Sequence, residues 1–508
     1  MAVINPIILL QAFLFFVCLI PFCLVLLKRA RGGNLSRRLP PSPPKLPIIG
    51  NLHQIGPLPH RSLQSLSKKY GPMMLLHLGS VPTLVVSSPE IVKEMLKTHD
   101  IIFSNRVKPM SVHVILNGCN DLAFSPYGEY WRKLRKLCVQ ELLSIRRVQS
   151  FQFLREEEVD RLVKRIRRHS GRETVDVSEL LLEATNDIAC RSVIGQRCEG
   201  ENGKSGWGDL SKKLLLTFPS FGFGDFFPSL GWMDELTGMT RRPRRTFEEV
   251  DAFFEEVIEE RRASLTDGSL SSKRTLVDIL LHLKENDSQD FDLDKATMKA
   301  ILLDMFVGST DTSLTTMEWA MTELMKKPNI MKKVQKEVRE VVGKKSKVDE
   351  NDINQMGYLK CVIKETLRLH APVPLLLPRE TSATATLGGY DIPCKARVYV
   401  NVWAIQRDPE VWDKAEEFIP ERFENNNSVD SIDPDFRYFP FGGGRRICAG
   451  MSFAQATIDY VMANLLYWFD WELPAGVTAD DLDMSELFGL NILKKVPLRL
   501  LPISYHTT

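Results

Sequence analysis

A single cysteine in a glycine-rich loop is the feature that most restricts the folds open to this chain. Residues 441–450 read FGGGRRICAG and fit the pattern FxxGxRxCxG, with Cys448 as its cysteine. Glycines let a backbone turn tightly and approach a flat ligand, while backbone N–H groups and nearby arginine favour a thiolate. A lone thiolate presented in this way is a candidate axial ligand to haem iron. The alternative is a buried structural cysteine, the usual fate of an isolated thiol.

The remaining composition narrows the class of protein. Nine cysteines are scattered with no CxxC pair, which indicates neither a disulfide framework nor a zinc site and favours a reducing compartment. Lys+Arg 66 against Asp+Glu 64 gives a net charge of +2, so nothing points to nucleic acid. A chain of 508 residues with 44% hydrophobic residues can bury a large core.

The N-terminal segment differs from the rest of the chain. Residues 7–27 are apolar except for Gln11 and are followed at once by a run of basic residues. A helix of this length would be roughly 32 Å long, close to the hydrocarbon thickness of a bilayer, and basic flanks stay cytosolic. A cleaved signal peptide would instead have basic residues first and a small-residue cleavage site after a shorter apolar stretch. We predict a transmembrane anchor over 1–28, a basic and proline-rich hinge over 29–50 and a globular domain over 51–508.

Helical spacing of apolar residues dominates from about residue 128, so we expect a mainly α body with small β-sheets. The longest predicted helix, 293–327, begins at Asp294, ends at Pro328 and is roughly 50 Å long. Its polar run 309–313 must be hydrogen-bonded internally or face a wet cavity. Further helices are expected at 155–168, 247–262, 358–370 and 451–468, and strands at 73–78, 83–86, 375–379, 385–392 and 397–402.

Three short motifs accompany the cysteine loop. Glu365 and Arg368 are spaced to share one helical face, which alone indicates an ordinary surface ion pair. Residues 420–423 read PERF, and residues 131–135 read WRKLR early in a predicted helix.

Over essentially its whole length, the chain resembles the cytochrome P450 superfamily. The resemblance rests on features that follow one another in this order: the anchor, the proline hinge, WxxxR, the long central helix, ExxR (Glu365 to Arg368), PERF and the cysteine loop. The sequences of residues 43–52 and 318–324 resemble those of the plant microsomal (type A) hydroxylases of terpenoid, alkaloid and phenylpropanoid metabolism. The resemblance implies a P450-like helical fold and a haem-thiolate catalytic domain over 51–508. It also implies a single-pass protein of the endoplasmic reticulum membrane whose catalytic domain faces the cytosol.

The resemblance assigns roles on the haem side. Cys448 becomes the proximal ligand of haem b (iron protoporphyrin IX), with Phe441 beside the sulfur and Gly444 and Gly450 permitting the loop. A buried network is implied to lock the cysteine loop in place; its members are Glu365, Arg368 and Arg422. Four further residues are implied to bind the haem propionates, where arginine gives bidentate recognition of carboxylates: Trp131, Arg135, Arg379 and Arg446.

On the central helix, the resemblance makes Asp311 and Thr312 the pair that orients water and delivers protons to dioxygen. Gly308 and Ser309 depart from the Ala-Gly pair usual at this point of the family pattern. The implied activity is a monooxygenase. Two alternatives stay open: redox-neutral rearrangement or dehydration on the same fold, which some relatives without the threonine perform, and a non-catalytic haem-binding membrane protein.

The resemblance places the substrate against 103–123, 214–227, 300–312, 373–377 and 487–490. The expected lining is apolar and suits a lipophilic secondary metabolite; it comprises Val107, Ile115, Phe218, Phe221, Ile301, Val307, Val373, Leu376 and Phe488. The aromatic run 218–227 either dips into the bilayer or packs over the active site.

The expected reaction needs two electrons from NADPH, yet the chain has no flavin or dinucleotide fingerprint. We therefore expect a separate membrane-bound reductase, NADPH-cytochrome P450 reductase. The basic residues expected to meet its acidic surface are Arg132, Lys133, Lys136 and Arg445.

Overall fold

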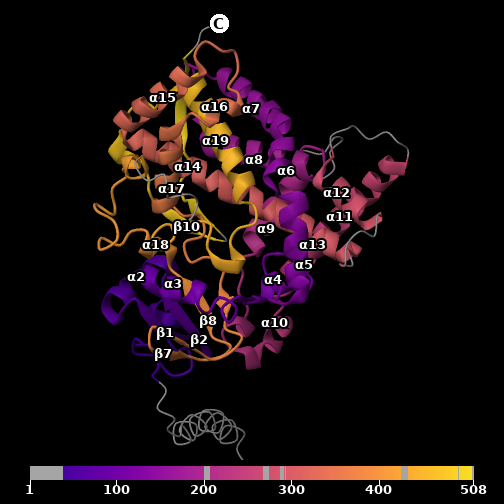
Figure 1. Ribbon diagram of the computed structural model, residues 1–508, viewed down its shortest axis with the longest axis vertical. Helices are drawn as coiled ribbons and strands as arrows, with labels where there is room; N and C mark the ends of the chain where they lie inside the picture. Colours follow the sequence, from indigo (N-terminus) through magenta and orange to yellow (C-terminus); the bar gives the residue numbers. More distant parts are fainter. Residues whose placement is uncertain are drawn as a thin grey trace, which may run out of the picture.

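The computed structural model describes residues 38–198, 206–266, 274–285, 291, 293–424, 433–489 and 491–505 (Figure 1). The predicted anchor, 1–28, lies outside these residues. Within them, no helix is long and apolar enough to cross a membrane. The described end of the predicted hinge packs on the body, because the Pro41 carbonyl accepts a hydrogen bond from Leu75 N (2.9 Å).

Helices form most of the body, as predicted (Figure 1). The α-helices are α2 (Pro59–Tyr70), α3 (Pro89–Lys97), α4 (Met110–Ile115), α5 (Glu129–Leu137), α6 (Ile145–Ser150), α7 (Gln152–Arg167), α8 (Val177–Val193), α9 (Trp207–Thr217), α10 (Trp232–Leu236), α11 (Arg241–Thr266), α12 (Leu276–Glu285), α13 (Lys295–Ser309), α14 (Asp311–Lys326), α15 (Pro328–Val342), α16 (Glu350–Ile353), α17 (Gly357–Leu369), α18 (Val402–Ile405) and α19 (Met451–Trp468).

The strands make four small sheets. The largest has the order β1-β2-β8-β5-β3 and lies with α2, α3 and α10 at the lower end of Figure 1. The others are β4-β12-β9, β10-β11 and the hairpin β6-β7. The strand bounds are β1 (Met73–Leu78), β2 (Val81–Val86), β3 (Asn105–Arg106), β4 (Val175–Asp176), β5 (Arg379–Glu380), β6 (Ala385–Leu387), β7 (Tyr390–Ile392), β8 (Arg397–Val400), β9 (Phe469–Glu472), β10 (Glu486–Phe488), β11 (Ile492–Lys494) and β12 (Arg499–Ser504).

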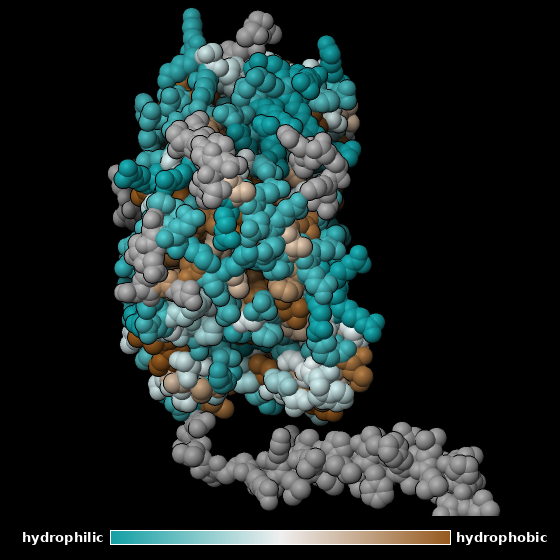
Figure 2. Space-filling model, turned by 90° about the vertical axis from the view of Figure 1, so that its right-hand side faces the viewer, coloured by the Kyte–Doolittle hydropathy of each residue, from teal (hydrophilic) through white to brown (hydrophobic). Residues whose placement is uncertain are grey.

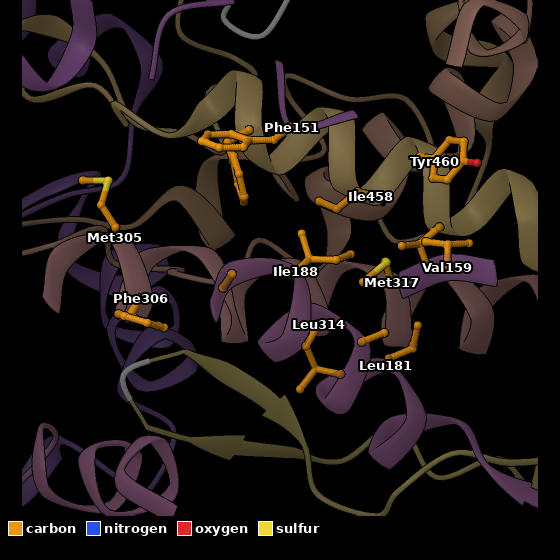
Figure 3. Packing of buried hydrophobic residues seen from close by; sticks show 14 of the residues in the cluster. Phe151, Val159, Leu181, Ile188, Met305, Phe306, Leu314, Met317, Ile458 and Tyr460 are labelled. Carbon is orange, nitrogen blue, oxygen red and sulfur yellow. The ribbon is translucent and has the colours of Figure 1, made fainter. Parts of the chain in front are cut away.

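The main core surrounds α14, which is buried along nearly its whole length between α8, α17 and α19. Figure 3 shows Ile188 of α8 close to Leu314 and Met317 of α14, with Ile458 of α19 nearby. Threonines are tolerated inside this helix because each hydroxyl donates to the carbonyl four residues earlier, as Thr322 does to Glu318 O (2.7 Å).

The predicted single helix 293–327 is wrong, because the structure divides it into α13 and α14 at Thr310 (φ −87°, ψ −70°). Hydroxyls on both sides of the break bond to the backbone: Ser309 Oγ donates to Met305 O (2.6 Å) and Thr312 Oγ1 to Gly308 O (2.9 Å). Such bonds compete with the helical ladder and bend it. The predicted cap is confirmed, since the Asp294 carboxylate accepts from Thr297 N (2.7 Å).

The other predicted helices and the strands at 73–78, 83–86 and 397–402 are confirmed within a few residues. The strand predicted over 375–379 is wrong except at Arg379, because Pro378 interrupts it and Leu376 adopts φ 52°. The strand predicted over 385–392 is a hairpin that turns at Gly388 and Gly389.

The sequence indicates no disulfide framework, yet the structure has a disulfide. Cys190, near the end of α8, is disulfide-bonded to Cys198, with a Cα–Cα distance of 5.8 Å. The chain turns back through Gly195, whose φ is 83°, and brings the two residues together. Their spacing forms no known motif, so the sequence carried no signal for this bond.

Candidate active site

The cysteine loop owes its shape to glycines that adopt positive φ. Gly442 has φ 72° and Gly444 has φ 66°, and a Cβ on Gly444 would lie 2.6 Å from Asp100 Oδ1. Cys448 N donates to Phe441 O (3.0 Å) and closes the turn. Gly450 differs, because its φ is −88° and a Cβ there would meet no protein atom within 4 Å. Glycine is therefore required by conformation at Gly444 but not at Gly450.

Asp100, in the chain after α3, fastens this loop from outside. Its carboxylate accepts from Arg445 N (3.0 Å) and Arg445 Nη1 (2.9 Å) and lies 3.6 Å from Arg379 Nη1. Asp100 is buried, so these bonds act in a region of low dielectric. Nothing in the sequence around Asp100 marks it, because it meets the loop only through the fold.

The Cys448 side chain opens into an internal cavity rather than packing in the core. Burial raises the pKa of its thiol, whereas the Gly450 N–H and the Arg135 charge lower it. The N–H group and the arginine therefore favour the thiolate as predicted, and burial acts against them. A bound metal ion deprotonates a coordinating thiol outright, so ligation has to supply what the loop does not.

The same cavity reaches the break between the central helices. Its wall includes Cys448 and Phe441 on the loop and Gly308, Ser309 and Thr312 around the α13–α14 junction. Most of the rest is apolar and comes from several elements: Leu122, Ala123, Val193, Leu276, Met305, Val373, Leu376, Leu377, Phe453 and Ile458. One cavity thus brings together the predicted proximal and distal residues.

Not every predicted substrate residue lines this cavity. Val373 and Leu376 do, whereas Ile115 and Ile301 are buried in the core and Phe221 is 44% exposed. Two further predicted lining residues border a separate small pocket beside α9: Phe218 and Val307.

Asp311 borders that same small pocket and not the cavity of Cys448. Its side chain is buried, and burial raises its pKa to about 7. Thr312, the next residue, faces the cavity while its hydroxyl donates to Gly308 O. The predicted acid–alcohol pair therefore spans the wall between two pockets.

Four arginines line the cavity near the cysteine loop: Arg106, Arg135, Arg379 and Arg446. All four donate to backbone carbonyls: Arg379 Nη2 to Gly443 O (2.8 Å), Arg135 Nη2 to Ile447 O (2.8 Å), Arg446 Nε to Ser104 O (2.9 Å) and Arg106 Nε to Ala123 O (3.1 Å). Burial lowers the pKa of Arg379 to about 10, and burial with the Arg379 charge lowers that of Arg446 to about 9. The cluster therefore concentrates positive charge at a site poor in water.

Trp131 packs against Arg446 of this cluster. Its indole N–H donates to Leu122 O (3.0 Å), and the Arg446 guanidinium lies 4.1 Å from its ring centroid. Because its single donor is already bonded to that carbonyl, Trp131 acts on the cavity through Arg446.

Glu365, Arg368 and Arg422 form a buried network, as the family resemblance implied and not the surface ion pair that the spacing alone indicated. Arg368 donates to both Glu365 oxygens (2.7 and 2.8 Å), and Arg422 Nε donates to Glu365 Oε1 (3.3 Å). Both Glu365 and Arg368 are fully buried. The remaining Arg368 donors bond the carbonyls of Gln406, Ala415 and Glu417.

This network contacts the cysteine loop only indirectly. Gln406 donates to the carbonyls of Leu367 (3.0 Å) and Arg368 (2.9 Å), and its Oε1 accepts from Phe439 N (3.1 Å). Phe439 lies two residues before Phe441, at the start of the loop. Gln406, which no motif singled out, is thus the direct link between the network and the loop.

Comparison with known proteins decides the family, because the cytochrome P450 family profile matches residues 40–498. The chain belongs to the cytochrome P450 family. It is 50% identical over 497 residues to a phenylacetaldehyde oxime monooxygenase of Prunus mume (96% of this chain, 94% of the relative). It is 45% identical over 489 residues to the premnaspirodiene oxygenase of Hyoscyamus muticus (95% and 96%).

A solved structure of a zebrafish cytochrome P450 with progesterone has the same fold. It covers 88% of this chain and 99% of its own, with a TM-score of 0.75 and 25% identity. As a cytochrome P450, the chain is an oxygen-dependent monooxygenase with haem-thiolate chemistry. Members of this family typically receive electrons from NADPH through a reductase.

The cavity of this P450 fits haem by charge as well as by its cysteine. The acids that act on the four arginines are Asp100 and Asp121, so positive charge is in excess. The two propionates of a haem would balance that excess, and arginine recognises carboxylates in a bidentate manner. Arg106 belongs to this set but was missed from the sequence, because it stands alone in the two-residue strand β3.

Proposed function

We propose that this P450 inserts one oxygen atom into a lipophilic plant secondary metabolite of terpenoid, alkaloid or phenolic type. The observation that carries the proposal is the shared cavity, in which Cys448 and the Thr312 hydroxyl meet an otherwise largely apolar wall. Apolar walls with a few polar groups suit lipophilic ligands. The relatives above bear the names of different substrates, so identity alone does not select one.

In this proposal Cys448 ligates the haem iron, and Arg106, Arg135, Arg379 and Arg446 bind the propionates. When bound, the haem-thiolate group supplies reductive activation of dioxygen. Phe441 packs beside the sulfur, and Gly450 leaves open the space that a side chain would enter.

Thr312 holds a proton at the cavity, and Asp311 supplies it from the far side of the wall. The Thr312 hydroxyl donates to Gly308 O, and its oxygen can still accept a hydrogen bond from a group in the cavity that Thr312 lines. Asp311 has a pKa near neutrality because it is buried, which suits an acid that is protonated and deprotonated in each cycle. Ser309 keeps its hydroxyl on Met305 O, so it leaves the Thr312 bond intact.

Turnover with purified reductase tests this function. With a panel of plant terpenoids, alkaloids and phenolics, we expect substrate-dependent NADPH consumption and product that carries oxygen from labelled O₂. Product formed without NADPH would instead favour redox-neutral chemistry. The Thr312→Ala variant should divert turnover toward peroxide, whereas Thr316→Ala, in the same cavity wall one turn later, should not. An unchanged product yield in Thr312→Ala contradicts the proton role.

We also propose that the reductase docks beside the cysteine loop. A surface groove there is lined by Arg132, Arg135, Lys136 and Arg445, with Tyr127 and Val139 between them. Lys133 is paired with Glu129 (3.1 Å), whereas within the described chain Arg132 and Lys136 form no ion pair. Charges of this kind act mainly on association rates. The double variant Arg132→Glu/Lys136→Glu should slow reduction of the P450 by the reductase at low salt, and Lys133→Glu should slow it less. Equal reduction rates in the wild type and both variants would contradict the docking site.

The single-pass anchor at 1–28 and the location at the endoplasmic reticulum, with the domain in the cytosol, remain part of this proposal. An apolar surface supports a membrane contact (Figure 2). Gly79 N donates to Ile49 O (3.1 Å) and Ser80 N to Phe226 O (2.9 Å), so two distant segments meet there. Exposed hydrophobic residues of these segments are Ile48, Ile49, Phe221, Phe223, Leu230, Trp232, Leu236 and Met239.

Vesicle flotation separates the anchor from this surface. A variant without residues 1–37 should still float partly with lipid vesicles in high salt. Adding Ile48→Ser, Trp232→Ser and Leu236→Ser should release it, and continued flotation would rule out the contact.

A further inference from the structure

Two buried aspartates face each other across the cavity wall, outside the acid–alcohol pair. Asp304 lies on α13 and lines the cavity, and Asp121 is fully buried in the loop between α4 and α5. The two carboxyl groups bind neighbouring N–H groups of one short backbone stretch, and each acts on the pKa of the other. Asp121 Oδ1 has no donor partner among the described N–H and O–H groups. Two such carboxyl groups can hydrogen-bond each other only when one of them carries a proton.

Both carboxyls also hold the same stretch of backbone. Asp304 Oδ2 accepts from Leu122 N (2.6 Å), and Asp121 Oδ2 accepts from Ala123 N (3.0 Å) and Phe124 N (2.8 Å). The Leu122 N–H therefore fastens the loop 121–124 to α13, while Asp121 closes that loop on itself through two N–H groups.

The Leu122 backbone connects this contact to the arginine cluster. Its carbonyl accepts from Trp131 Nε1 (3.0 Å) and from Arg446 Nη1 (3.4 Å). Arg446 also donates to the Ser125 carbonyl, one residue beyond the fastened loop. A shift of Leu122 would therefore move the donors that line the cavity.

We propose that Asp121 and Asp304 share one proton and fasten residues 121–124 to helix α13. Through the Leu122 carbonyl, this acid pair is a positioning element for Arg446. The shared proton gives the pair a single negative charge, which neighbours the positive charges of Arg106 and Arg446.

The surroundings of the pair agree with one proton and one charge. Burial is the largest cause that raises the pKa of both carboxyls, and for Asp304 the Asp121 charge comes next. Like charges in contact cannot both ionise at low cost. The titratable and charged groups that face the pair come from the strand β3, the loop, α5 and the cysteine loop: Arg106, Cys119, Tyr130, Cys138 and Arg446, with Lys108 acting on Cys119.

The test uses the full-length, haem-loaded protein and two substitutions of Asp304. An amide reproduces a protonated carboxyl, because it accepts from Leu122 N and donates to Asp121. Asp304→Asn should therefore leave amide hydrogen exchange over 119–126 close to that of the wild type. Asp304→Ala should speed it by about tenfold or more, since a buried N–H loses its acceptor. Asp294→Asn, which removes the charge of the residue that caps the same helix but keeps a capping side chain, should not change it.

Infrared difference spectra of the wild type against Asp304→Asn at neutral pH detect the proton directly. We expect the carbonyl band of a protonated carboxylic acid in the wild type, and its loss in the variant. Asp311 is present in both proteins and cancels. The absence of the band from the difference spectrum overturns the shared proton. Exchange over 119–126 as slow in Asp304→Ala as in the wild type overturns the positioning role.

Discussion

Replacing Gln406 with leucine should uncouple the buried network from the cysteine loop. Gln406 is fully buried and makes three hydrogen bonds, to the Leu367 and Arg368 carbonyls and from Phe439 N. Leucine has a similar volume but leaves these three backbone groups without that partner. At about 1 kcal/mol for each lost bond, and more where a group stays dry, the cost is about 3–5 kcal/mol. The loss falls at the start of the loop, so it should weaken thiolate ligation before it unfolds the protein.

The assay is the reduced carbon-monoxide difference spectrum, followed during heating at constant haem content. Gln406→Leu should convert from the thiolate-type band to the band without thiolate ligation at a temperature several degrees below the wild type. Gln335→Leu is the matched control, because this buried glutamine donates to Phe469 O (3.0 Å) away from the loop. If both variants lose the thiolate-type band at the same temperature, Gln406 does not link the buried network to the cysteine loop.

Two further predictions follow from the cavity. Arg106→Leu should raise the rate of haem release at least tenfold, because it removes a buried partner of a haem propionate. Lys108→Leu on the adjoining surface should leave that rate unchanged. Transfer of haem to apomyoglobin measures the rate for both variants. Burial raises the pKa of Asp311 to about 7, whereas an unfolded aspartate releases its proton near pH 4. Between these pH values the folded state therefore binds the proton more tightly than the unfolded state. The stability that the neutral carboxyl contributes is lost as the pH rises from about 4 to 7. Asp311→Asn should therefore gain thermal stability relative to the wild type at pH 8 but not at pH 4, and an equal difference at both values contradicts the raised pKa.

The sequence predicted the elements whose conformation is set by residues close to them in the chain. Helix α19 begins at Met451, as the glycine-rich loop before it indicated, and Gly444 needs the backbone that only glycine adopts at low cost. The arginines at positions 135, 379 and 446, which the family resemblance assigned to the haem site, line the cavity.

Features that depend on distant contacts were not predictable in this way. Asp100, Arg106 and Gln406 have no motif around them, and each gains its role from residues far along the chain. The break at Thr310 arises from competition between hydroxyls and backbone, which helix propensity summed over a window does not reveal.

The most direct test of the account replaces Cys448 and measures the reduced carbon-monoxide spectrum. The wild type and Cys138→Ala, which alters another buried free cysteine, should both show the thiolate-type band. Cys448→Ala should lack it even where haem is retained by the arginine cluster. A thiolate-type band that persists in Cys448→Ala would contradict the central claim that this cysteine ligates the haem.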